Sequence, residues 1–328
     1  MKDAGIVGLP GAGSSTIFTA LTALPGAAPG KSNQAVVPVP DPRVDELSRL
    51  HESKKSVYAT LRFVETSGMV RKGARGGAGA LSAELLGHLR TSDALLLVCR
   101  AFGGADASGD LAGLTLELIY ADLDVVTNKL QRDAKAARTP DEKRFVAELE
   151  RAKGVLETGD PLRGHAWEGF EGLALLTLKP FVALANVDED AGAVPDGMVR
   201  VAGALEAEVA GMDPAEAAEL LEGFGLKERA LPAVIRALYD QLDLITFLTA
   251  GDTESRAWEV HRGATAPQAA GVIHSDFERG FIKADVISYD ELVAAGSWTT
   301  ARAAGKVRQE GKAYVVQEGD VVEFRFAV

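Results

Sequence analysis

The residues whose types and spacing best suit the binding of phosphate lie near the start of the chain, where a glycine-rich stretch spans residues 8–16. A phosphate-binding loop has the pattern G-x-x-x-x-G-K-[ST], and Gly8, Gly13 and Ser15 occupy three of its positions. The glycines of such a loop let successive backbone N–H groups surround phosphate oxygens at the N-terminus of a helix, where the helix dipole also favours anions. The predicted phosphate-binding residues of this stretch are Gly8, Gly11, Ala12, Gly13, Ser14, Ser15 and Thr16.

Ser14 stands at the position where a phosphate-binding loop usually has lysine. The lysine adds a charge-assisted hydrogen bond to the outer phosphates, worth roughly 1.5 to 3 kcal/mol, so its loss weakens binding by roughly 10- to 150-fold. We therefore expect weak nucleotide binding. A glycine-rich turn between a strand and a helix that binds nothing has the same pattern, and the loop alone does not separate these two interpretations.

The composition is that of an ordinary globular protein, with 47% apolar and 25% charged residues among 328. The formal net charge of −12 argues against broad attraction to nucleic acid or to an anionic membrane, but it allows a local basic face. The single cysteine, Cys99, lies in an apolar run, which excludes an internal disulfide and favours a reducing compartment. With no signal peptide and no run of about 20 apolar residues, we expect a cytoplasmic protein that does not enter a membrane.

Strands alternate with helices through much of the chain. The loop at residues 8–13 joins a short apolar strand to an amphipathic helix that ends at Pro25, and a second glycine-rich loop at residues 73–79 follows another strand. Residues 25–42 carry no helical or strand periodicity and are predicted as an extended surface connection. The predicted strands lie at residues 4–7, 56–64, 94–99, 181–185 and 199–202. This order predicts a parallel, doubly wound sheet with its ligand site beyond the carboxyl ends of the strands.

Between residues 113 and 171 the pattern changes to two long helices. Thr139, Pro140 and Glu142 predict a capping box at the start of the second one. The apolar residues that recur every three or four positions are Leu116, Ile119, Leu123, Val126 and Leu130, then Phe145, Leu149, Ala152 and Leu156. We predict an antiparallel coiled-coil arm, and the alternative is a pair of helices that pack flat on the sheet domain.

From residue 244 onward the sequence favours short strands around one helix, which predicts a small β-grasp domain. The helix begins near Thr265. The predicted strands lie at residues 244–249, 256–260, 281–287 and 320–326.

Taken together, these features resemble the YchF family of Obg-related P-loop NTPases over essentially the whole chain. The similarity is strongest at residues 244–251, 262–271 and 286–290, which look like the family's TGS-type domain residue by residue. The resemblance implies an α/β architecture of three parts. These are a discontinuous P-loop G domain at residues 1–112 and 172–243, a coiled-coil insertion at residues 113–171, and a TGS-like β-grasp domain at residues 244–328.

The same resemblance implies a function in translation. Members of this family bind ATP at least as well as GTP and associate with ribosomes, so the expected partners are weakly bound ATP or GTP and a ribosome, or ribosome-associated RNA or protein, contacted through the TGS domain and the coiled coil. We expect a monomer.

The resemblance also assigns the nucleotide-binding residues. The family reads the base with an Asn-x-x-Glu motif, here at residues 186–189. Ser15 and Glu65 would reach the Mg²⁺ that accompanies the nucleotide, and the N–H of Gly68 would meet the terminal phosphate. The implied base-binding residues are Asn186, Val187 and Glu189.

Several parts of the hydrolytic machinery depart from the family's pattern. The loop lysine is replaced by Ser14, and Glu65 replaces an aspartate with a side chain one methylene longer. Residues 25–36 form a shortened first switch without a matching threonine, and residues 103–109 contain no histidine to match the one proposed to act in hydrolysis. Because phosphoryl transfer depends on positioned charge, we predict weak or absent hydrolysis and assign no catalytic residue.

Two alternatives stay open at this point. One is a slow ATPase or GTPase that uses a cation from outside the loop, for which Arg71, Lys72 and Arg75 are candidates, although a solvated basic loop is the simpler interpretation. The other is an interaction module that binds no nucleotide. Whether the protein is an enzyme is therefore left undecided by the sequence.

Overall fold

The computed structural model describes residues 1–28, 31–66, 81–188 and 193–327, which form two compact units. The N-terminal unit contains residues 2–37 and 62–234. The C-terminal unit contains Met1, residues 38–61 and the chain from Ile235 onward. The domain boundaries given above stay a prediction. In the structure, residues 38–61 pack with the C-terminal part of the chain. No helix of the described residues is long and apolar enough to cross a membrane.

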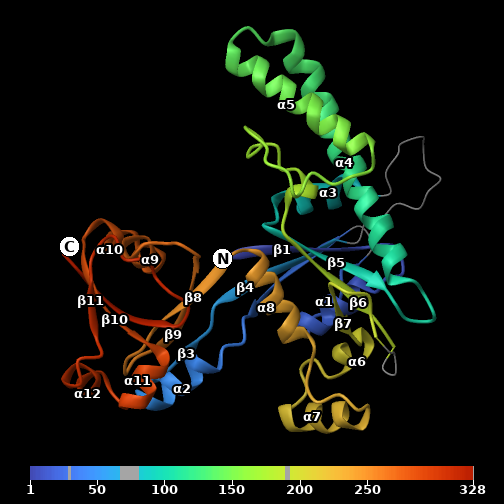
Figure 1. The fold of residues 1–328 in the computed structure, drawn as a ribbon. Helices are drawn as coiled ribbons and strands as arrows, with labels where there is room; N and C mark the ends of the chain where they lie inside the picture. The colour runs from blue at the N-terminus through green and yellow to red at the C-terminus, as the bar shows by residue number, and fades with distance from the viewer. Residues whose placement is uncertain (29–30, 67–80, 189–192, 328) are drawn as a thin grey trace. The chain divides into compact units, whose positions relative to one another are not determined.

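A six-stranded sheet in the order β2-β4-β1-β5-β6-β7 forms the centre of the N-terminal unit (Figure 1). Parallel pairing runs from β1 through β5 and β6 to β7. The central strand β5 is wholly buried up to Cys99, as expected for a parallel strand covered on both faces. The strands are β1 (Lys2–Gly8), β2 (Ser32–Pro38), β4 (Thr60–Thr66), β5 (Ala94–Arg100), β6 (Phe181–Asn186) and β7 (Met198–Val201).

Helices pack against this sheet through apolar residues. Leu95 and Leu97 of β5 belong to a buried apolar cluster with residues of α3 and α4, and Ala185 of β6 belongs to another with Leu205 of α6. Outside the arm, the helices of this unit are α1 (Ser14–Thr22), α3 (Ala83–Thr91), α6 (Gly203–Glu208), α7 (Pro214–Gly223) and α8 (Leu231–Gln241), together with the 3₁₀ turn η1 (Leu176–Leu178). The boundary between the two units falls within α8.

Two details of the predicted sheet are wrong. The single strand expected at residues 56–64 is two strands, β3 (Ser56–Val57) and β4, because β3 pairs with β9 of the C-terminal unit while β4 joins the N-terminal sheet. The surface connection expected at residues 25–42 contains strand β2, since pairing with β4 supplies the order that the sequence pattern lacks.

The predicted antiparallel helical arm is formed by α4 (Ala107–Ala136) and α5 (Pro140–Glu157), which pack side by side in Figure 1. The capping box is confirmed, because the backbone N–H of Glu142 donates to Thr139 Oγ1 at 3.3 Å and the N–H of Thr139 donates to Glu142 Oε2 at 2.9 Å. The buried seam includes Ile119, Val126, Leu149, Ala152 and Leu156. Leu116, by contrast, is 40% exposed and lies off the seam.

The C-terminal unit contains a second six-stranded sheet, in the order β11-β10-β12-β8-β9-β3. Strands β8 and β12 are parallel, whereas β8 pairs with β9 and β10 pairs with β12 in antiparallel fashion, which is the β-grasp arrangement. The remaining strands are β8 (Leu244–Thr249), β9 (Ser255–His261), β10 (Phe281–Ser288), β11 (Arg308–Glu310) and β12 (Asp320–Phe326).

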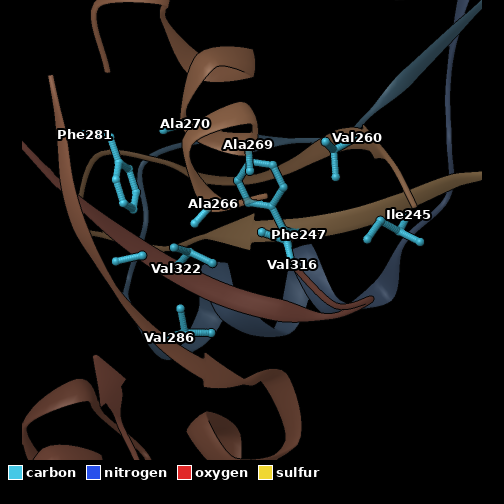
Figure 2. Close-up of a cluster of buried hydrophobic side chains, with 11 residues drawn as sticks. Ile245, Phe247, Val260, Ala266, Ala269, Ala270, Phe281, Val286, Val316 and Val322 are labelled. Carbon is cyan, nitrogen blue, oxygen red and sulfur yellow. The ribbon is translucent and has the colours of Figure 1, made fainter. Parts of the chain in front are cut away.

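Helix α9 covers one face of this sheet, and Figure 2 shows its alanines above Phe247 and Val322. Their small side chains let the helix lie close to the strands, and all three alanines are fully buried. The predicted fold class is confirmed in both units. More helices surround the β-grasp sheet than the one predicted: α2 (Pro42–Leu50), α9 (Ala266–Ile273), α10 (Ser275–Arg279), α11 (Tyr289–Ala295) and α12 (Trp298–Ala303).

Candidate functional site

The glycine-rich loop joins the carboxyl end of β1 to the N-terminus of α1, as predicted. Gly11 and Gly13 have φ angles of 85° and 89°, a region that side chains other than glycine rarely adopt. At Gly8 a Cβ would lie 2.6 Å from Ser14 Oγ and 2.7 Å from the carbonyl oxygen of Val98, so only glycine fits there. The backbone path of the loop therefore requires glycine at positions 8, 11 and 13.

A cavity of about 330 Å³ lies at this loop and is lined by residues from β1, the loop, α1, the end of β4 and Leu85. Gly13 caps α1 without any side-chain hydrogen bond, which leaves the first N–H groups of the helix for a ligand. Among the described residues that line the cavity, none is lysine or arginine. The cavity thus offers backbone donors and a helix dipole to an anion, and no described cation.

Glu65 lies beside the loop at the end of β4 and is 2% exposed. Its carboxylate accepts a short hydrogen bond from the Ser15 hydroxyl and another from the backbone N–H of Ala27 at 2.6 Å. The next residue, Thr66, has a buried hydroxyl for which no partner exists among the described residues. A buried hydroxyl without a partner costs free energy unless a ligand or water satisfies it.

Hydroxyl and carboxylate oxygens of this kind are suitable ligands for Mg²⁺. Mg²⁺ prefers hard oxygen ligands and commonly takes one or two from the protein and the rest from phosphates and water. Ser15 and Glu65 supply a hydroxyl and a carboxylate of that kind. Within the described residues no three His, Cys, Asp or Glu side chains come together as a metal site.

Asn186, at the end of β6, is tied to the loop. Its side-chain Nδ2 donates to the Ala12 carbonyl at 2.9 Å, and its Oδ1 accepts from the Gly203 N–H at 3.1 Å. A Cβ at Gly13 would overlap the same amide nitrogen. The predicted base-reading asparagine is thus tied to the glycine-rich loop by one hydrogen bond and to the first residue of α6 by another. The neighbouring Val187 is buried among apolar residues of α6 and α7.

Two residues near Asn186 were missed by the sequence analysis. Arg100 pairs in register with Asn186, so both side chains leave the sheet on the same face. The guanidinium carbon of Arg100 lies 4.9 Å from the centre of the Phe102 ring, and Phe102 reaches within 4.0 Å of the Cβ position at Gly13. Their place beyond the carboxyl end of β5, between β1 and β6, is the signal that would have identified them.

The loop between β5 and α4 is linked to the same region, because the Gly103 N–H donates to Asp188 Oδ2 at 2.9 Å. The other predicted site residues, Gly68 and Glu189, lie outside the described residues, as do the candidate cations Arg71, Lys72 and Arg75. Their predicted roles stay predictions.

Comparisons with known proteins give a consistent result. A family model named YchF-GTPase_C, described as a protein of unknown function (DUF933), matches residues 244–327. The "Ribosome-binding ATPase YchF" of Bacillus subtilis is 39% identical over 366 residues, covering 99% of each chain, and the "Obg-like ATPase 1" of rice is 36% identical, covering 99% of this chain and 92% of the rice protein.

A solved structure of the Schizosaccharomyces pombe YchF GTPase matches with a TM-score of 0.84 and 31% identity, covering 99% of this chain and 97% of the yeast chain. The alignment with the B. subtilis protein is longer than the 328 residues of this chain, so that protein carries residues without a counterpart here.

Proposed function

The chain belongs to the YchF family, and we propose that it binds ATP or GTP weakly in the loop cavity, associates with the ribosome, and hydrolyses nucleotide slowly or not at all. The observation that carries the proposal is the group formed by Ser15, Glu65 and Thr66 at the N-terminus of α1, where a phosphate chain and its Mg²⁺ would find oxygen ligands and backbone donors. Ribosome association is inferred from the relatives, which are named as ribosome-binding ATPases.

Each described residue of the site has a role that its position supports. The N–H groups at the start of α1 would bind phosphate oxygens, and Ser15 and Glu65 would hold Mg²⁺, which supplies charge neutralisation when bound. Asn186 fixes the loop through Ala12 and stands where the base-binding motif begins. Its second amide hydrogen, for which no partner lies among the described residues, would donate to the base.

Slow hydrolysis follows from the charges that the cavity lacks. Enzymes that transfer phosphoryl groups stabilise the transition state with positioned cations, and each such contact is worth about 10²- to 10³-fold or more in rate. The described part of this cavity has no lysine or arginine, and Ser14 places only a hydroxyl beside Gly8. A working ATPase would need a cation from outside the described lining of the cavity.

Calorimetry with ATP, GTP and ADP, with and without Mg²⁺, tests the binding part of this proposal. We expect dissociation constants weaker than micromolar for ATP with Mg²⁺, and weaker still for the Ser15→Ala variant. Lys227→Ala, at an exposed position outside the cavity, serves as the control with unchanged affinity. Absence of heat at millimolar nucleotide would leave only the alternative of an interaction module that binds no nucleotide.

A further inference from the structure

A second cavity of the N-terminal unit, of about 430 Å³, lies in the segment between α5 and β6 and shares no lining residue with the loop cavity. Its polar lining side chains are His165, Glu171 and Lys179, and its apolar lining residues are Trp167, Phe170, Ala174, Leu175, Leu178 and Pro180. An apolar wall with a few polar groups is typical of a site for a small molecule.

The aromatic wall of this cavity is fixed by contacts of its own. The rings of Trp167 and Phe170 lie 6° from parallel with their centres 5.2 Å apart. Trp167 Nε1 donates to the Leu162 carbonyl at 2.8 Å, and the guanidinium carbon of Arg151 lies 3.8 Å from the centre of the Trp167 ring. Phe170 is buried and packs edge-on against Phe145. A flat molecule would therefore find this wall already formed.

Three partly buried cations lie close to one another near this cavity, and we name them the arm-root cations: Arg90, Arg163 and Lys179. None of them forms an ion pair with a carboxylate among the described residues. Burial lowers the pKa of Arg163 and of Lys179, because their charged forms lose hydration. These cations are therefore held in a place that disfavours positive charge.

A single buried carboxylate, that of Asp122, acts on all three cations. Its oxygens accept hydrogen bonds from the backbone N–H groups of Leu176 at 2.8 Å and Thr177 at 2.7 Å. Burial raises the pKa of Asp122, which is fully buried. The nearby Asp93 already pairs with Lys2 at 3.3 Å. One engaged carboxylate does not balance three desolvated cations, so the region is suited to a further anion.

The arm-root cations also have hydrogen-bond donors to spare. Lys179 donates to the carbonyl of Ser92, which uses one of its three N–H groups. The Nε and Nη2 atoms of Arg163, and Nε of Arg90, are buried without a partner among the described residues. Buried donors without an acceptor cost free energy. Packing of the chain itself therefore does not account for this cluster.

Two of these cations lie at the cavity. Lys179 is part of its lining. The guanidinium carbon of Arg163 lies 4.0 Å from the centre of the Phe181 ring, and Phe181 directly follows Pro180 of the lining. Positive charge and the aromatic wall thus belong to the same small region.

We propose that this cavity binds an organic oxyanion, with its charged group at Lys179 and its flat apolar body along Trp167 and Phe170. An inorganic anion would leave most of the volume and the aromatic wall unused, and a neutral molecule would leave the cations uncompensated. The acidic lining residue, Glu171, is exposed, so solvent screens its repulsion. This site is independent of the proposed nucleotide site and of the ribosome.

Four probes separate the contributions of charge and ring. They are 2-naphthoate, 2-naphthyl phosphate, the neutral 2-naphthalenemethanol and inorganic phosphate, each titrated by calorimetry into the full-length protein. We expect both aromatic anions to bind with dissociation constants of about 1 mM or tighter. The neutral ring and inorganic phosphate bind at least about 10-fold more weakly, because each lacks one of the two kinds of contact.

Two pairs of variants locate the site. Lys179→Met removes the charge and weakens both aromatic anions about 10-fold or more, whereas Lys179→Arg stays close to the parent. His165→Glu places a negative charge in the lining and weakens binding, whereas Ala166→Glu adds the same charge at the next residue, outside the lining, and does not. Circular dichroism verifies that each variant keeps the helices of the parent.

The inference is overturned if neither aromatic anion gives heat at millimolar concentration, or if the neutral ring binds as well as 2-naphthoate. It also fails if His165→Glu and Ala166→Glu have equal effects, or if Lys179→Met binds like the parent. Loss of binding in Ser15→Ala would assign the anions to the loop cavity instead. If Lys179→Met does not fold, the two glutamate variants decide alone, since both positions are exposed.

Discussion

Replacing Ser14 by lysine tests the account of the loop most simply. In the structure Ser14 Oγ points toward Gly8, which has no side chain, and the adjoining cavity of about 330 Å³ has no described lysine or arginine in its lining. A lysine that follows the same direction would place its ammonium group in this cavity. There it would meet the outer phosphates of a bound nucleotide.

The expected gain is that of one charge-assisted hydrogen bond, roughly 1.5 to 3 kcal/mol, which is roughly 10- to 150-fold in affinity for ATP. The affinity for ADP, which lacks the outermost phosphate, increases less. The matched control is Ser14→Met, whose side chain has similar length without the charge. Calorimetry at constant Mg²⁺ and low salt measures all three proteins.

If Ser14→Lys and Ser14→Met both bind ATP no better than the parent, the loop does not face the phosphates and the expectation is refuted. An equal gain in both variants would also contradict it, since the effect would come from apolar contact. A gain that disappears at high salt agrees with the electrostatic origin.

Two further predictions concern stability and reactivity. Gly13→Ala lowers the free energy of unfolding in urea by more than Gly11→Ala, because both positions have positive φ, worth about 1–2 kcal/mol of strain, but only the Cβ at position 13 overlaps Asn186. Equal destabilisation by the two substitutions would remove the argument for the contact. Burial raises the pKa of the Cys99 thiol to about 12, so native protein stays unlabelled by iodoacetamide at pH 8.5 and becomes labelled in urea. Labelling of the native protein within minutes would contradict that burial.

The sequence predicted the parts of the fold that depend on local signals. Thr139, Pro140 and Glu142 specify the start of α5 through a capping box that needs no distant partner. The loop at Gly8 and Gly13 was located by spacing, and its conformation agrees. The α/β pattern of alternating strands and helices likewise depends on local periodicity and proved correct.

Features that depend on distant partners were not predictable in this way. The break after Val57 exists because β3 pairs with β9, about two hundred positions away in the sequence, and strand propensity does not record such a pairing. The hydrogen bond from Ala27 to Glu65 and the unpartnered hydroxyl of Thr66 arise from how two segments meet. Phe102 lies near Gly13 for the same reason, because β1 and β5 are neighbouring strands of the sheet.

The central claim is that the loop binds nucleotide through backbone donors while lacking the charges that hydrolysis needs. Single-turnover phosphate release, with protein in excess over ATP and above the dissociation constant measured by calorimetry, tests it most directly. We expect measurable ATP binding with phosphate release no faster than in a protein-free control. Stoichiometric phosphate release clearly above that control would contradict it and would establish a working ATPase.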